Sequence, residues 1–506
     1  MIGLTLERLR REGQAFSEEI SREGYLAHAG HKPTADLQPI YERHAAILGD
    51  GALELTLDLF RTSSESSEER RSAGFLLEWQ IESQAAREVV TLDEREVAWE
   101  SSAIIDVAGT RPIPYQRASI EIANAKHRAE RLAIDEARAL AAAAEHSPLR
   151  LERIQREKEY VEKLELADGY IPTFETLTGI SLRDLGSRCT AFLATTEAMW
   201  SDTLPFFLRR TLQITPGEAT RADALALFRG REFDAAFPAS DLEPAIRRHA
   251  AELAIDPFAG GRITFDLDDR EGKDSRAFCA PVRVPEEVYL VLRPHGGVTD
   301  YTTLLHELGH ALHFGYADPH YPFEYRWLGD NSVTEGYAML FDHLMQDRGW
   351  LLRYTGLGRN DVGEYLRMAA FEELHFLRRY CAKLLYELDV YSGTTSWDVL
   401  PDVYVETLSS ATGFRYQSAD AFIDLDPRFY SARYLRAWQL QSILSKSLVT
   451  QFDEDWFRNP AAGPWMVQNL FGEGQRETAT ELAVRASGEE LSFDPLVRAI
   501  ERGLTG

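Results

Sequence analysis

Two histidines four positions apart, with a glutamate directly after the first, are the residues of this chain best suited to chemistry. The segment from His306 to His310 reads H-E-L-G-H. Residues four apart on a helix share one face, so two imidazoles at this spacing can bind one zinc ion. The adjacent Glu307 can then activate a water bound to the metal. Because such a short pattern also arises by chance, the motif requires a third ligand before it predicts a metal site.

The third ligand is expected to be a carboxylate from a later helix, because catalytic zinc sites combine three protein ligands with one open position. A third histidine of the H-E-x-x-H-x-x-G-x-x-H kind is excluded, since those positions hold His313 and Tyr316. Glu335 lies 25 residues after His310, in a segment whose apolar residues indicate a half-buried helix. Asp342 follows Glu335 by seven residues and shares its helix face.

The elements that must position these residues are a helix and two strands. Thr299 or Asp300 is the expected N-cap of the motif helix, which continues with an apolar stripe at helical spacing. Upstream, residues 262–267 alternate in polarity and 288–292 form a second β-rich run. A small sheet here would offer an edge to an extended peptide, which we expect to lie along Val288 to Leu292.

Before residue 255 the pattern predicts one helix after another. The stretch from Tyr115 to Glu145 is rich in alanine and interleaved charge, and it is expected to end before Ser147-Pro148. A following helix is expected from Leu149 to Leu166. After Glu335 the chain is expected to return to helices up to its end.

The composition of the chain excludes some classes of binding partner and indicates a cellular location. The formal net charge of −26 over 506 residues argues against nucleic acid and against anionic membrane surfaces. No run approaches the roughly 18 apolar residues of a membrane helix, and Met1 to Arg11 lacks the apolar core of a signal peptide. Three cysteines without pairing spacing (Cys189, Cys279 and Cys381) favour a reducing cytoplasm, and we expect them to be buried apolar residues.

Taken together, the segment Arg270 to Phe278, the β-rich run, the H-E-L-G-H motif and Glu335 at this spacing resemble the thimet oligopeptidase and oligoendopeptidase F family of zinc metallopeptidases. The resemblance covers roughly Asp256 to Leu504. It implies a mainly α fold, with two helical lobes flanking a deep substrate channel and a small β-sheet beside the zinc helix. Residues 1–200 would form one channel wall, and residues 201–506 the catalytic region, with its motifs in 256–504.

The resemblance also assigns roles. His306, His310 and Glu335 match the ligands of one Zn²⁺ per chain, and Glu307 matches the general base. Asp342 matches a carboxylate that follows the ligand glutamate by seven residues, where it can hydrogen-bond a ligand histidine.

The family further supplies tyrosine hydroxyls to the substrate from a late Tyr-Tyr-x-Tyr segment. Here the segment Asp426 to Leu435 contains Tyr430 and Tyr434, which are four residues apart on one predicted helix face. The histidine and Gly-Gly that precede these tyrosines in the family are absent, and Ile423-Asp424-Leu425 stands nearby instead. Either tyrosine is therefore a candidate for the catalytic hydroxyl.

Three other histidines are expected to have no role in metal binding or catalysis. His313 shares the face of His310 and could compete as a ligand, but Glu335 explains the third position better, so we interpret His313 as a packing residue near the site. His295 and His320 stand among turn residues and are expected on surface loops.

The leading hypothesis is a cytoplasmic zinc metallopeptidase whose partners are short peptide substrates. One alternative is a helical binding or scaffold protein with a structural or vestigial metal site. Glu307 argues against it, because a structural zinc needs no base. Another alternative is a zinc hydrolase of a non-peptide amide. Cleavage preference, internal versus terminal cleavage and oligomeric state stay open at this level.

Overall fold

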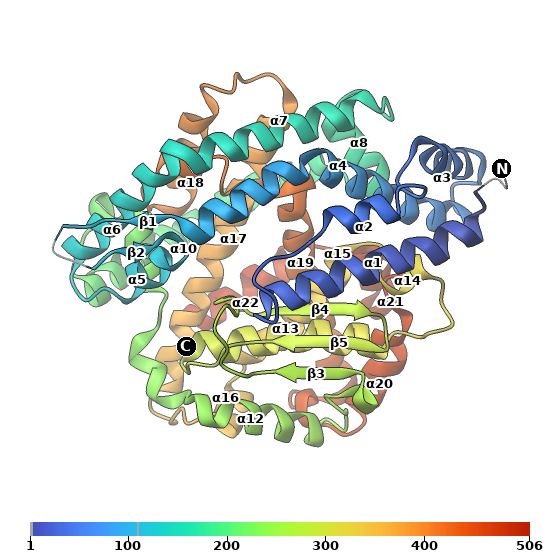
Figure 1. Ribbon diagram of the computed structural model, residues 1–506. Coiled ribbons are helices and arrows are strands. Elements are labelled where there is room, and N and C mark those ends of the chain that lie inside the picture. The colour runs from blue at the N-terminus through green and yellow to red at the C-terminus, as the bar shows by residue number, and fades with distance from the viewer. Residues whose placement is uncertain (1–3, 109–110, 506) are drawn as a thin grey trace.

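Helices make up most of the described chain, which comprises residues 4–108 and 111–505 of a computed structural model (Figure 1). Those of the amino-terminal half are α1 (Leu6–His28), α2 (Gln38–Arg43), α3 (Asp50–Thr62), α4 (Glu68–Ser102), α5 (Ala118–Asn124), α6 (Arg128–Ala141), α7 (Ser147–Lys163), α8 (Tyr170–Thr178), α9 (Leu182–Thr195), α10 (Glu197–Phe207), α11 (Arg221–Leu227) and α12 (Ala239–Glu252). Those of the carboxyl-terminal half are α13 (Val298–Tyr316), α14 (Phe323–Arg326), α15 (Asn331–Asp342), α16 (Arg348–Tyr354), α17 (Val362–Ser392), α18 (Leu400–Thr412), α19 (Tyr430–Phe452), α20 (Ala462–Asn469), α21 (Ala479–Ser487) and α22 (Asp494–Thr505). The predicted mainly α fold class is confirmed. Residues 1–3 of the segment examined for a signal peptide lie outside the described residues.

A three-stranded sheet precedes α13, as predicted. Its order is β3 (Ile263–Asp266), β5 (Glu287–Val291) and β4 (Phe278–Arg283), with β5 parallel to β3 and antiparallel to β4. β3 and β5 correspond to the two predicted strands. β4 was not predicted, because Pro281 stands inside it, and a proline cannot donate to a ladder and is tolerated in strands mainly at an edge. A separate two-stranded ribbon pairs β1 (Ile104–Ile105) with β2 (Ile113–Pro114).

The central position of β5 corrects one expectation. Strands are hydrogen-bonded to both of its edges, so no peptide can pair with it, and the expectation that a substrate lies along Val288 to Leu292 is wrong. β4 is the edge strand beside the motif helix. The backbone N–H of Cys279 in β4 hydrogen-bonds the carboxylate of Glu307. Further along β4, the hydroxyl of Ser21 in α1 donates to the carbonyl of Pro281 over 2.9 Å.

The sheet is held between α1 and α13, which Figure 1 shows running close to the strands. On the α1 side, the rings of Tyr25 and Tyr289 stack with centroids 3.9 Å apart, and Arg22 pairs with Glu287 at 2.6 Å. On the α13 side, alternate residues of β5 such as Leu290 are fully buried. The first helix of the chain therefore braces the strands that lie against the helix of the His306–His310 motif.

One apolar core connects the two halves of the chain. Its buried residues come from α4 and α8 as well as from α13, α15, α17 and α19. The amino-terminal helices therefore pack into the same core that supports the motif. The division at residue 200 into a channel wall and a catalytic region stays a prediction.

The predicted helix end before Ser147-Pro148 is wrong. α6 continues through a π-helical turn at Ala142–His146 and directly into α7. In a regular α-helix the ring of Pro148 would clash with the carbonyl four residues earlier. A π turn directly before the proline widens the helix and relieves that contact. The side chain of His146, at the end of this turn, contacts α4.

Candidate metal centre

Three helices lie together at the centre, with α15 packed between α13 and α19. α13 carries the motif from His306 to His310, and α15 carries Glu335. Gly309 permits the close approach of α13 and α15, because a Cβ at this position would lie 2.5 Å from both the Cα of Ala338 and the carbonyl oxygen of Tyr337. The glycine of the motif therefore brings the third ligand within reach of the two histidines.

Local capping sets where the two ligand helices begin. α15 starts after Asp330, whose side chain accepts a hydrogen bond from the N–H of Ser332 over 2.9 Å. α13 starts earlier than expected, after Gly297 with φ of 96°, and not after Thr299 or Asp300. Asp300 instead accepts hydrogen bonds from two backbone N–H groups of the preceding loop. The predicted cap residue thus anchors the loop that leads into the helix.

The three predicted ligand atoms converge. Oε2 of Glu335 lies 3.5 Å from Nε2 of His306 and 3.6 Å from Nε2 of His310, and all three atoms lie within 4.8 Å of one another. A tetrahedral zinc with bonds of roughly 2.1 Å separates neighbouring ligand atoms by roughly 3.4 Å. Oε2 of Glu335 is also buried without a hydrogen-bond partner among the described residues, which is costly unless a cation binds it. These residues therefore fit a zinc ion.

The other nitrogen of each histidine is occupied. Nδ1 of His306 lies 2.8 Å from Oδ2 of Asp342, and Nδ1 of His310 lies 2.8 Å from Oγ1 of Thr334. With Nδ1–H donating to these acceptors, the Nε2 lone pair of each ring is available to a metal. Asp342 thus lies where the resemblance placed it. Thr334 was not predicted, because its only signal is its position beside Glu335.

Glu307 is directed toward the sheet and the ligands. Its side chain lies near both histidines and Glu335, whose charges act on it, and the backbone N–H of Cys279 hydrogen-bonds its carboxylate. The residue is 8 % exposed. A carboxylate with this support can keep one orientation while it accepts a proton.

Charges within the centre oppose the effect of burial. Burial disfavours charged His306, yet its hydrogen bond to Asp342 and the negative charge of Glu335 raise its pKa well above the ordinary value. Burial acts to raise the pKa of Glu335, but the charges of the neighbouring His310 and His306 lower it far below the ordinary value. For Glu307 burial prevails and raises the pKa, although His310 and His306 act to lower it. A raised pKa makes Glu307 a stronger base than an ordinary carboxylate.

The two candidate tyrosines stand at the start of α19 with ring centroids 5.0 Å apart. The hydroxyl of Tyr430 donates to Oε1 of Glu335 over 2.7 Å. The hydroxyl of Tyr434 has no hydrogen bond to any described residue.

The two residues directly before Tyr430, Arg428 and Phe429, have φ of 55° and 57°. Left-handed backbone is unfavourable for such residues, so packing of Phe429 and an ion pair from Arg428 to α7 must hold this entry to the helix.

The remaining histidines lie where the sequence placed them. His313 is fully buried, packs against Phe314 and Tyr337, and has its pKa lowered to about 3 by burial. His295 and His320 are exposed on loops. None of the three contributes to the converging ligand set.

A further row of hydrogen bonds behind the centre was not predicted. Oδ1 of Asp342 lies 2.6 Å from Nδ1 of His343, and Nε2 of His343 lies 3.0 Å from Oε1 of Glu373 in α17. Burial disfavours the charged imidazole, but both carboxylates raise the pKa of His343 well above its ordinary value. Glu373 is 30 residues away in sequence, at no recognisable spacing, so only the fold reveals this row.

A second group of metal-type residues lies in the amino-terminal half. Glu96 and Glu100 of α4 approach His146, and their ligand atoms also lie within 4.8 Å of one another. Here, however, Nε2 of His146 lies 2.8 Å from Oε1 of Glu96, which is a direct hydrogen bond. Arg150 pairs with the same carboxylate at 3.3 Å, and Nδ1 of His146 lies 3.3 Å from the hydroxyl of Tyr115. The polar groups of His146, Glu96, Arg150 and Tyr115 therefore find their hydrogen-bond and ion-pair partners in one another.

Solved structures share this architecture. A protein assigned as oligoendopeptidase F aligns with a TM-score of 0.70 and 15 % identity, over 99 % of this chain and 92 % of that one. Another so assigned, from Bacillus anthracis str. Ames, aligns with a TM-score of 0.69 and 14 % identity, over 99 % of this chain and 90 % of that one. An M32 carboxypeptidase from Deinococcus radiodurans R1 aligns with a TM-score of 0.60 and 15 % identity, over 98 % of each chain. No protein-family model and no curated protein matches the sequence. The chain therefore has the fold of these proteins, as the resemblance implied.

Proposed function

We propose that this chain is a zinc-dependent metallopeptidase that hydrolyses peptide bonds of short oligopeptides. The observation that carries the proposal is the convergence of His306, His310 and Glu335, with Glu307 next to the first ligand in α13. The fold shared with an oligoendopeptidase F and a carboxypeptidase supports peptides as the substrate class. One zinc ion per chain is the proposed cofactor.

A zinc ion held by these ligands would polarise a substrate carbonyl and acidify water. Glu307 accepts the proton of the attacking water and returns it to the leaving amine. Burial, which raises the pKa of Glu307, favours the first of these transfers. Asp342 and Thr334 hold the two imidazoles so that each directs Nε2 toward the ion.

The tyrosines have different proposed tasks. As water attacks, negative charge develops on the carbonyl oxygen, and a hydroxyl directed at that oxygen stabilises it. Tyr434 has an uncommitted hydroxyl for this purpose. Tyr430 already donates to Glu335 and is proposed to orient that ligand.

An extended peptide is proposed to pair with the edge of β4. The N–H of Cys279, in β4, contacts Glu307, so a strand added at this edge would pass close to the base. Pairing through backbone hydrogen bonds requires an unfolded chain. The proposed channel between the amino-terminal and catalytic regions would exclude folded domains for the same reason.

Cleavage of peptides of graded length tests the proposal. Zinc-loaded protein is incubated with peptides of about 5 to 40 residues and with a stably folded protein, and products are identified by mass spectrometry. Short peptides should be cleaved and the folded protein spared. The positions of the cuts distinguish internal from terminal cleavage. Rapid cleavage of the folded protein, or no cleavage of any peptide, contradicts the proposal.

The same measurements separate the alternatives. A scaffold with a structural metal site would bind zinc but show no turnover on any substrate, and Glu307→Gln would change nothing. A hydrolase of a non-peptide amide would spare all peptides yet cleave small amides, and it would lose that turnover in Glu307→Gln.

A cytoplasmic location is also proposed. The structure contains no disulfide among the described cysteines, although the thiols of Cys189 and Cys381 are close enough to hydrogen-bond. Both are buried, as expected, whereas Cys279 is partly exposed in β4. Among the described residues, no helix combines the length and apolar character needed to cross a membrane.

A further inference from the structure

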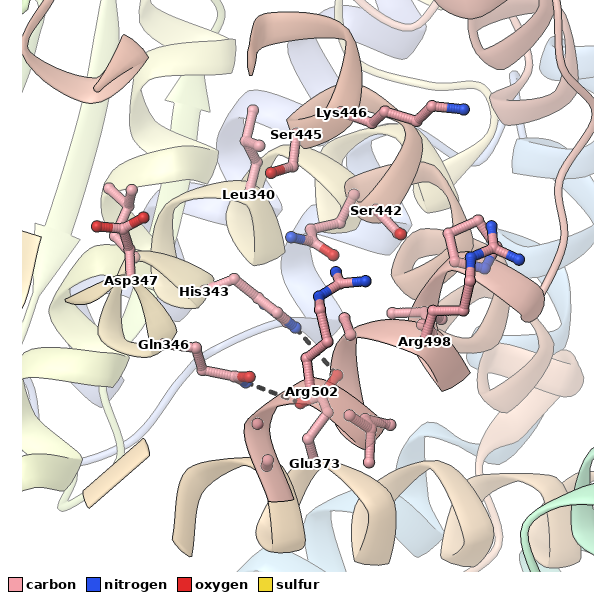
Figure 2. Close-up of a pocket in the computed structure, with 18 of the residues that line it drawn as sticks. Leu340, His343, Gln346, Asp347, Glu373, Ser442, Ser445, Lys446, Arg498 and Arg502 are labelled. Atoms are coloured by element: carbon pink, nitrogen blue, oxygen red, sulfur yellow. Dashed lines mark hydrogen bonds and ion pairs between the residues drawn. The ribbon is translucent and has the colours of Figure 1, made fainter. Parts of the chain in front are cut away.

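A cavity of about 700 Å³, open to solvent on one side, lies behind the candidate metal centre and is bordered by α17, α19, α22 and the turn after α15 (Figure 2). It is separate from the face where the zinc ligands converge. His343 and Glu373 line it, and these residues continue the hydrogen-bond row from Asp342. The cavity wall is therefore connected to the ligand His306 through three successive hydrogen bonds.

One wall carries positive charge without counterions. Arg498 and Arg502 lie one turn apart on α22, and Figure 2 shows Arg502 pointing into the cavity. Neither forms an ion pair with any described residue. Like charges four residues apart on a helix disfavour the helix, so an anion bound between them would relieve that repulsion. Lys446, on the rim, is already paired with Glu489 at 2.5 Å.

The floor offers hydrogen bonds that nothing in the protein uses. Gln441 is only 6 % exposed, lines the cavity, and has no hydrogen-bond partner among the described residues. Ser442 and Ser445, from the same face of α19, are likewise free. The polar atoms of the Gln441 amide are not fully buried, so they reach the cavity, where a polar ligand can hydrogen-bond them.

The lining also contains acidic and apolar side chains. Glu373 and Asp347 would repel a purely anionic ligand, but they would attract an ammonium group. Leu344, Leu366 and Trp456 provide an apolar surface. The cavity thus combines a cationic pole, an anionic pole and an apolar patch.

We propose that this cavity binds a small zwitterion, namely a free amino acid or dipeptide with an apolar side chain. Its carboxylate pairs with Arg498 and Arg502, its ammonium group with Glu373, and its side chain packs on Trp456. By ordering Glu373 and His343, the ligand steadies Asp342 and with it His306. That such ligands would be reaction products rests on the proposed peptidase function, whereas their binding does not.

Tryptophan fluorescence of the zinc-loaded protein tests the binding, with L-leucine as the probe. A saturable change is expected with leucine and not with N-acetyl-L-leucine amide, which carries no charge. Inorganic phosphate, an anion alone, should bind at least about tenfold more weakly, since it loses a charged contact. The signal should disappear in Trp456→Phe. No saturable change with leucine, or phosphate binding as tight as that of leucine, overturns the proposal.

Leucine affinities of substituted proteins test whether leucine binds in this cavity. Arg502→Gln and Gln441→Leu should each weaken leucine binding by about tenfold or more. Arg209→Gln, which changes an exposed arginine of the amino-terminal half, should leave it unchanged. Because Arg502 is exposed, its variant should fold even if Gln441→Leu does not, and thermal unfolding checks both. Equal affinities in Arg502→Gln and Arg209→Gln would place the ligand elsewhere and overturn the assignment.

Zinc release into a colorimetric chelator tests the connection. Leucine should slow release by about fivefold or more in the unaltered protein, and not in Arg502→Gln. Identical release with and without leucine overturns the coupling to His306. Because neither measurement uses peptide hydrolysis, the proposed peptidase function stands or falls separately.

Discussion

The two groups of histidine and glutamate in this molecule contain similar residues and differ in what surrounds them. At the centre formed by His306, His310 and Glu335, the facing atoms are 3.5 and 3.6 Å apart, and one buried carboxylate oxygen has no partner. At the group around His146, nitrogen and Glu96 oxygen meet at 2.8 Å. The first arrangement leaves room for an ion between its atoms, and the second closes on itself.

Neighbouring groups cause this difference. In the first group, Asp342 and Thr334 occupy the outer nitrogens and turn both Nε2 atoms inward. In the second, Arg150 supplies the positive charge that an ion would otherwise bring. One histidine and two glutamates beside an arginine therefore form an ion-pair network, whereas two histidines and a glutamate whose outer nitrogens are already engaged form a candidate metal site.

The sharpest test of the contrast is removal of one glutamate from each group. Glu335→Ala should lose the stoichiometric zinc and all hydrolysis, because two histidines alone bind the ion too weakly. Glu100→Ala is the matched control and should keep both. Metal analysis by mass spectrometry after gel filtration measures the difference. Full zinc content in the Glu335 variant would remove this residue from the ligand set.

Glu307→Gln should keep its zinc and lose about 10²–10⁴-fold in kcat. The amide is nearly isosteric but cannot accept the proton of water. Steady-state kinetics on a fluorogenic peptide, together with metal analysis, checks both parts. Glu96→Gln, in the group without a catalytic task, is the control and should retain full turnover. Substantial turnover of Glu307→Gln at neutral pH would point to another base.

Tyr434→Phe should lower kcat by about 10²–10³-fold with little change in KM, because its hydroxyl acts on charge that develops in the transition state. Tyr430→Phe should have a smaller effect on kcat and should also weaken zinc retention, because it removes the hydrogen bond to Glu335. Kinetics and zinc titration of both variants distinguish the two tasks. The reverse pattern would exchange them, and unaltered behaviour of both would leave them as packing residues.

Asp342→Asn and Thr334→Val should weaken zinc binding by about 10–100-fold, because the first removes the negative charge that strengthens the hydrogen bond to His306 and the second removes the acceptor that orients His310. Competition with a calibrated chelator measures the affinity. Tyr115→Phe removes the corresponding contact at His146 and should leave zinc affinity unchanged. Equal affinity in all three variants would mean that packing alone orients the imidazoles.

The smallest effect is expected at the second group, on stability. Burial acts to raise the pKa of Glu96, but the hydrogen bond to His146 and the charge of Arg150 lower it below the ordinary 4.5. The pair therefore stabilises the fold above about pH 4.5, and this contribution disappears as the pH falls through the lowered value. Glu96→Gln should reduce the melting temperature by about 2–5 °C at pH 7 and by less near pH 4. A decrease that persists undiminished at acidic pH would assign the effect to packing.

Some elements follow directly from local sequence. The helices that carry the H-E-L-G-H motif and Glu335, and the alternating run of β3, each reflect interactions within a few residues, and the structure agrees with them. The helix of Glu335 was expected to be half-buried, but it is buried from Ser332 to Phe341 because α13 and α19 both pack on it. β4 was not predicted, because it contains Pro281. The end of a helix was predicted before Pro148, but a π turn directly ahead of this proline allows the helix to continue. In both places the backbone accommodates a proline, at a sheet edge in β4 and after a π turn in α7.

By itself, the sequence determined the proposed ligand set, because helical periodicity places His306 and His310 on one face and the spacing of a family that the chain resembles pointed to Glu335. The tertiary structure alone decided how the ligand atoms meet, since contact between α13 and α15 depends on Gly309 and on helices packed from distant parts of the chain. It also decided that β4 stands at the sheet edge and that Glu373 stands behind the centre. Distances between segments far apart in sequence depend on how side chains fill a shared core, and no local spacing records that packing.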